Sequence, residues 1–143
     1  MPDHTQGIIP HLVVDDAASA LDFYKKAFAA TQVMRMPAED GKRLLHAEVR
    51  MNGARLFLRD NFPDQCSDQG GKVSEPKALG GTPVTMHLEV ADCDKTFKRA
   101  VAAGATVVME PWDAFWGARY AQVIDPFGHA WSFAHPLQRM EPA

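Results

Sequence analysis

Little in this 143-residue chain supports a disulfide framework, a nucleic-acid surface or a membrane span. It has two cysteines, Cys66 and Cys93, and no CxxC pair, so neither a set of disulfides nor a structural zinc site is expected. Its net charge is -3, and its scattered lysines and arginines lack the concentrated basic face that binds phosphate. No stretch approaches the ~20 apolar residues of a membrane-spanning helix, and no signal-peptide pattern opens the chain. We therefore expect a cytoplasmic protein that binds neither nucleic acid nor membrane.

What the sequence does contain is an internal repeat. Three stretches recur at an offset of 75 or 76 residues: 10–16 with 86–92, 30–34 with 105–109, and 53–58 with 128–133. This period is too long for a solenoid repeat, so it indicates that a whole supersecondary unit is duplicated. We expect the function to lie in the cleft between the two copies.

Each copy has the same order of predicted elements: a strand, a helix and three more strands. Runs or alternation of apolar and β-branched residues predict the strands, a 3.6-residue apolar stripe predicts the helices, and Asp15, Asp16 and Asp92 are candidate N-caps. The predicted strands are 8–14, 31–36, 43–51 and 54–60 with helix 17–29, then 83–90, 105–110, 117–124 and 129–135 with helix 93–103. The fold class is therefore α+β, with two tandem βαβββ modules.

The chain is expected to form a single domain over residues 1–143. Module one covers residues 7–60 and module two covers residues 83–136. The connector, residues 61–82, is rich in Gly, Pro, Ser and Asp, which is typical either of a plain linker or of a flap over a ligand.

Two stretches carry a resemblance to a known family. IPHLVVDDAASALDFYKKAF (9–28) and ARYAQVIDPFGHAWSFAHP (118–136) are similar to the PhnB-like branch of the vicinal oxygen chelate superfamily, which includes glyoxalases, bleomycin-resistance proteins and extradiol dioxygenases. The resemblance implies an open, curled mixed sheet around a cleft, with the helices outside. It also implies a homodimer, in which some members exchange modules between chains.

Metal-dependent members of this superfamily hold a divalent ion with His and Glu side chains from the first and last strands of each module. The corresponding positions here are Ile9, Phe57, Thr85 and Ser132. Apolar and hydroxyl side chains do not replace the imidazole and carboxylate ligands that bind Ni, Zn or Fe. We therefore expect no metal at the usual site and no cofactor.

A displaced metal site is the alternative. His11 and His87 each lie two residues beyond a usual ligand position, are equivalent in the repeat, and could face one another across the module interface. Glu48 or Glu89 would then supply a carboxylate. The other interpretation is that both histidines only make hydrogen bonds to polar neighbours in the cleft.

Further residues are expected to line the cleft from strand parity or from aromatic clustering. Trp112, Phe115, Trp116 and Tyr120 could form an aromatic wall for a planar ligand, or could pack in the core and at its edge. Asp125 and His129 are expected to be structural residues of the last hairpin turn. The predicted ligand-binding set is His11, His46, Glu48, Phe57, Thr85, His87, Glu89, Trp112, Trp116, Tyr120 and Ser132.

Two functions follow from these residues. The first is binding of a small organic molecule in the inter-module cleft without a chelated metal, in the manner that the resemblance to bleomycin-resistance proteins implies. The second is an enzyme, a lyase, isomerase or dioxygenase of the superfamily, using the displaced His/Glu site. In a metal-free version, His11, His87 or Glu48 would be the general acid or base.

Overall fold

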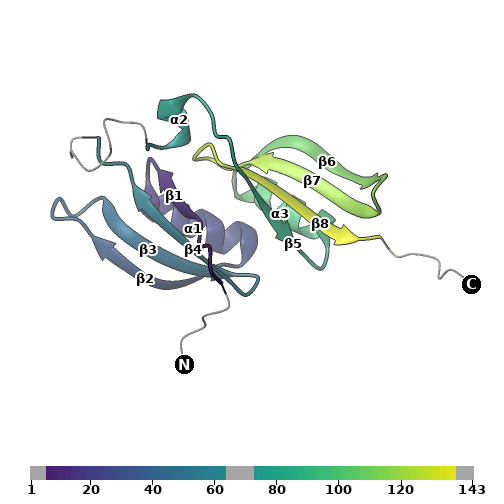
Figure 1. Ribbon diagram of the computed structural model, residues 1–143, viewed down its shortest axis with the longest axis horizontal. Coiled ribbons are helices and arrows are strands. Elements are labelled where there is room, and N and C mark those ends of the chain that lie inside the picture. The colour runs from purple at the N-terminus through teal and green to yellow at the C-terminus, as the bar shows by residue number, and fades with distance from the viewer. Residues whose placement is uncertain (1–5, 64–72, 138–143) are drawn as a thin grey trace, which may run out of the picture.

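The computed structural model describes residues 6–63 and 73–137, and it confirms the predicted α+β fold of two βαβββ modules (Figure 1). Module one consists of β1 (His11–Val14), α1 (Ala17–Phe28), β2 (Thr31–Pro37), β3 (Leu44–Met51) and β4 (Ala54–Asp60). Module two consists of β5 (Thr85–Glu89), α3 (Cys93–Ala103), β6 (Thr106–Ala114), β7 (Ala118–Ile124) and β8 (Ala130–Pro136). The short helix α2 (Pro76–Leu79) lies between them.

The predicted helix starts are confirmed at the level of single hydrogen bonds. The Asp16 carboxylate accepts from the backbone amide of Ser19, and the Asp92 carboxylate accepts from that of Lys95, each at 3.1 Å. These side chains satisfy amides that have no partner within the first turn of a helix. Of the two candidates in module one, Asp16 and not Asp15 is the cap.

Most element boundaries agree with the sequence prediction to within two residues, but two strands and the connector differ by more. β1 starts at His11 rather than at residue 8. β6 continues to Ala114 rather than ending at residue 110, because it stays paired with β7 as far as the pair of Ala114 with Ala118. The connector contains α2, whose first turn is capped by the Glu75 carboxylate accepting from the amide of Ala78 at 3.0 Å.

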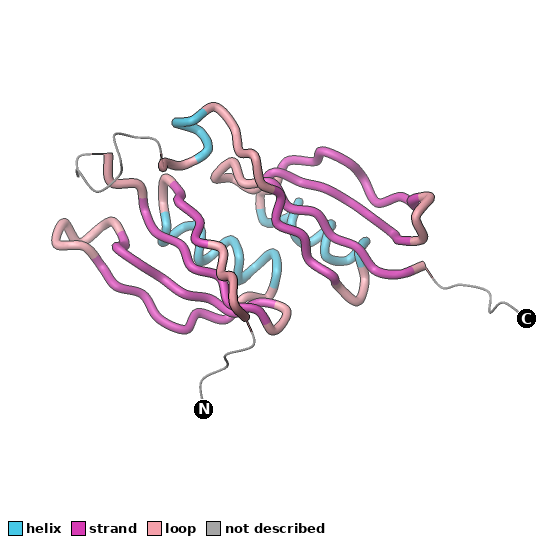
Figure 2. The backbone as a smooth tube through the Cα atoms, in the orientation of Figure 1, coloured by secondary structure: helices cyan, strands magenta, loops and turns pink. Residues whose placement is uncertain are grey.

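The strands form two four-stranded sheets, in the orders β1-β4-β3-β2 and β5-β8-β7-β6. In each sheet the first strand pairs in parallel with the last, and the other pairs are antiparallel. The repeat extends to the register, since His11 lies opposite Phe57 and His87 lies opposite Ser132. Within residues 6–63 and 73–137 no strand of one sheet pairs with a strand of the other, and the sheets lie side by side (Figure 2).

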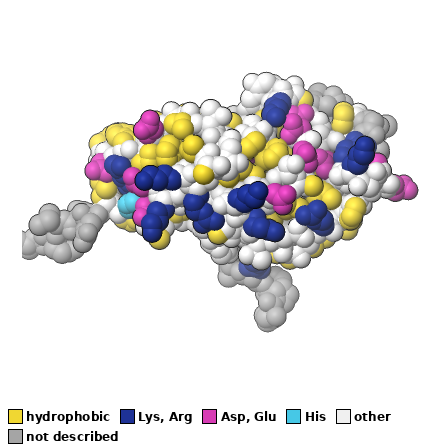
Figure 3. Space-filling model, turned by 180° about the vertical axis from the view of Figure 1, so that it is seen from behind, with side chains coloured by type: hydrophobic (Ala, Val, Ile, Leu, Met, Phe, Trp, Pro, Cys, Tyr) yellow, Lys and Arg dark blue, Asp and Glu magenta, His cyan; other side chains and the backbone are white. Residues whose placement is uncertain are grey.

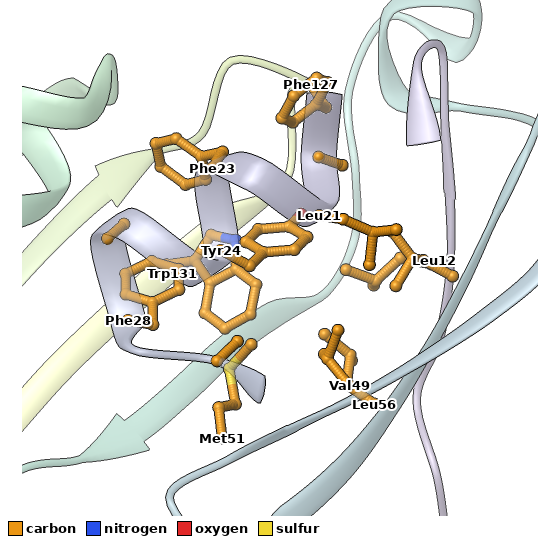
Figure 4. Close-up of a cluster of buried hydrophobic side chains, with 14 of the residues drawn as sticks. Leu12, Leu21, Phe23, Tyr24, Phe28, Val49, Met51, Leu56, Phe127 and Trp131 are labelled. Atoms are coloured by element: carbon orange, nitrogen blue, oxygen red, sulfur yellow. The ribbon is translucent and has the colours of Figure 1, made fainter. Parts of the chain in front are cut away.

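Both modules share one hydrophobic core on the helix side of the sheets, where α1 packs against α3. In Figure 4 the rings of Tyr24 and Phe28 from α1 lie against Trp131 from β8, and the ring centroids of Phe28 and Trp131 are 4.7 Å apart. Phe23 of α1 is also buried, and the ring of Phe127 from module two packs edge to face against it. The packing of one module on the other therefore widens the buried face of α1.

A buried carboxylate joins the modules. Asp125, in the turn before β8, accepts hydrogen bonds from the Tyr24 hydroxyl at 2.6 Å and the Trp131 indole at 2.8 Å. It also accepts from the backbone amides of Phe127 and His129, each at 2.9 Å. The predicted structural role of Asp125 in this turn is thereby confirmed.

His129 also has the predicted structural role. Its Nε2–H donates to the backbone carbonyl of Val13 at 2.8 Å, so a histidine of module two is fixed to β1 of module one. Burial, followed by the neighbouring Asp125, raises the pKa of Tyr24 well above its usual value. The Tyr24 hydroxyl therefore stays protonated and serves as a donor.

This packing sets where the remaining strand residues point. Leu12, Val14, Met86 and Leu88 belong to the shared core or pack against it, as the alternation predicts. The intervening residues therefore lie on the opposite faces of their sheets, away from α1 and α3. No helix in the described part of the chain combines the length and apolar character needed to cross a membrane.

Candidate ligand-binding faces

The face of the first sheet that points away from α1 and α3, here called the module-one face, is formed by the outward residues of β1 to β4. At its centre the rings of His11, His46 and Phe57 meet edge to face. The centroid of His46 lies 5.4 Å from that of His11 and 4.7 Å from that of Phe57. The structure thus brings three predicted site residues together from three adjacent strands.

Charged groups surround this ring cluster. The Arg55 Nε donates to the Glu48 carboxylate at 2.8 Å, and this hydrogen bond lowers the pKa of Glu48. The Arg55 guanidinium also lies over the Phe57 ring, 5.2 Å from its centroid. Burial, followed by the charges of His46 and Arg59, lowers the pKa of His11.

The face of the second sheet that points away from α1 and α3, here called the module-two face, centres on His87. Its Nδ1 lies 2.7 Å from the Ser132 Oγ, and its Nε2 lies 2.6 Å from a Glu89 carboxylate oxygen. A ring that donates from Nε2 to Glu89 and accepts at Nδ1 from the Ser132 hydroxyl satisfies both bonds. All three residues are in the set predicted from the sequence, but their hydrogen bonds to one another were not predicted. The bond between His87 and Ser132 depends on the parallel register of β5 and β8, which places the two residues opposite each other.

An aromatic surface extends from His87 toward the β6–β7 turn. Tyr120 stacks on the imidazole with the ring planes 16° apart, and Trp116 meets Tyr120 with its centroid 5.4 Å away. Trp112 and Phe115 each pack edge to face on Trp116. Trp116 is 54% exposed and Phe115 is 90% exposed, so these two side chains lie at the surface and not in the core.

The two faces lie on separate sheets of the chain. Both sheets have α1 and α3 behind them and their uncovered faces on the same side of the molecule (Figure 1). His11 and His87 therefore do not face one another within one chain, as the displaced-site alternative would need. Thr85, also predicted to bind ligand, is exposed at the start of β5.

The arrangement of donor groups within the described residues does not fit a metal ion. Among residues 6–63 and 73–137, no three or more His, Cys, Asp or Glu side chains converge on one point. Glu48 is paired with Arg55, and both nitrogens of His87 have hydrogen-bond partners. At the usual ligand positions, Phe57 contributes a ring to the module-one face and Ser132 is buried beneath His87.

The hollows between the modules lie elsewhere. A groove of about 380 Å³ runs between β1 and β5 beneath the connector, and of the predicted site residues only His11 lines it. A second hollow of about 470 Å³ lies between the end of α1 and α3, and only Glu89 of the set lines it. These two grooves between the modules hold few of the predicted site residues, and most of that set lies on the open faces instead.

The chain consists of two βαβββ modules whose helices α1 and α3 pack together. This arrangement defines a class of proteins, and a comparison with family models identifies the class. The model of the Glyoxalase/Bleomycin resistance protein/Dioxygenase superfamily matches residues 2–133. The chain belongs to this superfamily.

Among curated proteins the chain is similar to the uncharacterized protein Rv0887c of Mycobacterium tuberculosis (strain ATCC 25618 / H37Rv). They are 55% identical over 131 residues, which cover 92% of this chain and 75% of that protein. The uncharacterized protein Mb0911c of Mycobacterium bovis is also 55% identical, with 92% of this chain and 84% of the relative covered.

Among solved structures, TioX from Micromonospora sp. ML1 is 26% identical, with a TM-score of 0.67 and coverage of 95% of this chain and 100% of TioX. A PhnB protein from Bacillus cereus, described as a putative 3-demethylubiquinone-9 3-methyltransferase, is 14% identical with the same TM-score of 0.67. That likeness covers 91% of this chain and 99% of the PhnB protein and shows the fold alone. Membership of the PhnB-like branch stays a prediction.

Proposed function

We propose that this protein binds a small planar organic molecule in a cleft between two copies of the chain. In this proposal the module-one face of one copy lies opposite the module-two face of the other. The observation that carries it is that each face holds clustered rings and hydrogen-bonding groups, while within one chain the faces lie side by side. A two-fold dimer would form two identical clefts.

The apolar side chains on these faces support such a pairing. Met36 lies opposite His46 on the module-one face and is 47% exposed. Trp112 lies opposite Tyr120 on the module-two face and is 38% exposed. Burying apolar surface of this kind is favourable by about 25 cal/mol per Å². The dimer would therefore cover apolar side chains that the single chain leaves in water.

The same faces suit a small planar ligand. Rings on both walls would stack on it, as ligand pockets are mostly apolar with a few polar groups that fix orientation. His87, held by Ser132 and Glu89, and Tyr120 would provide those polar groups. This chemistry needs no metal ion.

The first test combines molar mass and ligand binding. Light scattering should give the mass of two chains, against 15.8 kDa for one. Three naphthalene probes carrying an amide, a carboxylate or an ammonium group are then titrated by calorimetry. At least one should bind, and Trp116→Ala should weaken it while the helix-side control Val101→Ala should not. A monomer, or no binding by any probe, would contradict the proposal.

A complementation experiment tests whether the cleft is shared between chains. One variant, His46→Ala/Phe57→Ala, damages the module-one face, and a second, Trp116→Ala/Tyr120→Ala, damages the module-two face. Neither alone should bind. After the two are unfolded and refolded together, half of the dimers are mixed and each holds one intact cleft, so about a quarter of the sites should return. A site within one chain cannot be restored in this way.

An enzyme is the second candidate, and the Glu89–His87–Ser132 chain favours it. A carboxylate that orients an imidazole prepares the ring to accept or donate a proton. Ser132 is buried, so here it would hold the ring rather than act as a nucleophile. Mass spectrometry of small-molecule mixtures incubated with the protein should show turnover that His87→Gln abolishes and His135→Gln retains. If the wild-type protein converts nothing, this candidate fails.

The displaced metal site is tested separately. Across the proposed dimer, His11 of one copy and His87 of the other would lie on opposite walls of one cleft. Metal analysis of purified protein, and of a His11→Ala/His87→Ala variant, decides the matter. Stoichiometric Ni, Zn, Fe or Mn that the variant loses would favour the metal-dependent alternative over the metal-free cleft.

A further inference from the structure

Gln122 of β7 is a polar residue of the module-two face that is absent from the set predicted from the sequence. It lies directly opposite Ser132 of β8, and Ser132 lies opposite His87 of β5, so these residues form a row across the sheet. Residues that lie directly opposite one another share one face of a sheet. Gln122 is therefore on the same face as Tyr120, which precedes it on β7 by about 7 Å along the strand.

The side-chain amide of Gln122 is available to a ligand. Within residues 6–63 and 73–137 it makes no hydrogen bond, and neither does the Tyr120 hydroxyl. Both side chains are half-buried. Their polar neighbours are bonded among themselves instead, since His87 contacts both Ser132 and Glu89. Gln122 and Tyr120 therefore offer this face two uncharged hydrogen-bonding groups.

Pairing of two copies of the chain would take water away from these groups. A covered amide without a hydrogen-bond partner costs free energy, so closure of the cleft favours a ligand that satisfies it. The Gln122 oxygen is an acceptor and the nitrogen is a donor, so a ligand group that only donates or only accepts would satisfy one of the two atoms. A group that presents both a donor and an acceptor would satisfy both.

The strands of the second sheet place no lysine or arginine beside this amide. Arg119 is the one such residue in β5 to β8, and its guanidinium donates to the Asp94 carboxylate of α3 at 3.0 and 3.1 Å. Arg119 therefore lies on the helix side, where Figure 3 shows further lysine and arginine side chains in a row. On the module-two face the polar part of a ligand would meet uncharged groups.

We propose that the ligand of this cleft is a planar aromatic amide or lactam and that Gln122 selects it. An N–H beside a C=O on the ligand would form two hydrogen bonds with the Gln122 amide, one in each direction. The rings of the ligand would lie against Tyr120 and Trp116. This inference rests on the proposed function, because it names the ligand of the same cleft.

The experiment compares 2-naphthamide with methyl 2-naphthoate, two uncharged probes that share the rings and the carbonyl and differ in the N–H donor. Calorimetry on the full chain should show the amide binding about 10-fold more tightly or better, because the ester leaves the Gln122 oxygen without a donor. Gln122→Met keeps the length of the side chain and removes its amide, so the two probes should then bind within about 2-fold of each other. Trp116→Ala should weaken both probes together.

Gln32 provides a matched control. It lies opposite the core residue Val49, so it is on the helix side of β2, and its oxygen accepts from Arg35. Gln32→Met removes the same group outside the cleft and should leave both affinities within about 2-fold of wild type. If circular dichroism shows that Gln122→Met is unfolded, Gln122→Val replaces it, because a β-branched side chain suits a strand.

The outcomes separate this inference from the proposed function. If methyl 2-naphthoate binds as tightly as 2-naphthamide, the amide inference is wrong and the binding function stands. If the amide is preferred but the Gln122 variant keeps that preference, the assignment to Gln122 is wrong. If neither probe binds, and the charged naphthalene probes do not bind either, the proposed function itself fails.

Discussion

The hydrogen bond from Tyr24 to Asp125 should be a major source of stability, because it joins α1 of module one to the last hairpin of module two. Both residues are buried, and the Asp125 oxygen that accepts from the Tyr24 hydroxyl also accepts from the Trp131 indole. Tyr24→Phe removes the hydroxyl and keeps the ring that packs on Phe28 and Trp131. The variant therefore leaves a buried carboxylate oxygen with one donor fewer.

The expected loss of stability follows from the type of hydrogen bond that Tyr24→Phe removes. A hydrogen bond to a charged group contributes roughly 1.5–3 kcal/mol, and an under-satisfied buried acceptor costs about as much. We expect the free energy of unfolding to fall by about 2 kcal/mol. For a chain of this length that corresponds to a melting temperature lower by about 6–8 °C.

Urea unfolding, followed by tryptophan fluorescence and circular dichroism, measures this loss. The matched control is Tyr120→Phe, since the Tyr120 hydroxyl makes no hydrogen bond within the described residues and its ring is half-buried on the module-two face. The control should stay within about 0.5 kcal/mol of wild type. If the stability of Tyr24→Phe also stayed this close to wild type, the hydrogen bonds around Asp125 would not be a major source of stability.

Three further substitutions test other parts of the structure. Asp92→Ala removes the N-cap of α3 and should cost about 1 kcal/mol in urea unfolding. Gly128 has φ of +93°, and a Cβ at this position would lie 2.8 Å from the Cβ of Pro76. Gly53 has φ of +78°, and a Cβ there would have no atom within 4 Å. Gly128→Ala should therefore lower the free energy of unfolding more than Gly53→Ala does. Equal losses for the two glycines would show that α2 moves aside without cost. The pKa of His11 is lowered in the folded chain, so the unfolded chain binds a proton more readily and stability falls as the pH drops through 6.5. His11→Gln should therefore lose less stability than wild type between about pH 7.5 and pH 5, and a variant that follows the wild-type curve would refute this.

Local sequence patterns were enough for the elements and their faces. Alternation places Leu12 and Val14 in the core and His11 on the other side, and the structure agrees. Asn52-Gly53 predicts the β3–β4 turn, where both residues have positive φ. These features depend on neighbours within a few residues, so short-range periodicity and turn chemistry are sufficient to predict them.

Contacts between distant segments could not be predicted in this way. Phe127 of module two packs on Phe23 of α1, and Ser132 meets His87 through the register of two strands far apart in the chain. Neither contact leaves a local pattern in the sequence.

The repeat by itself therefore determined that the chain has two βαβββ modules and which strand residues avoid the core. Only the tertiary structure decided how the modules sit together. Because α1 packs on α3 and Asp125 binds Tyr24, the two sheets lie side by side, with His11 on one open face and His87 on the other. The physical reason is that alternation encodes the side of a sheet on which a residue lies, whereas the relation between two sheets depends on side-chain packing across the whole core.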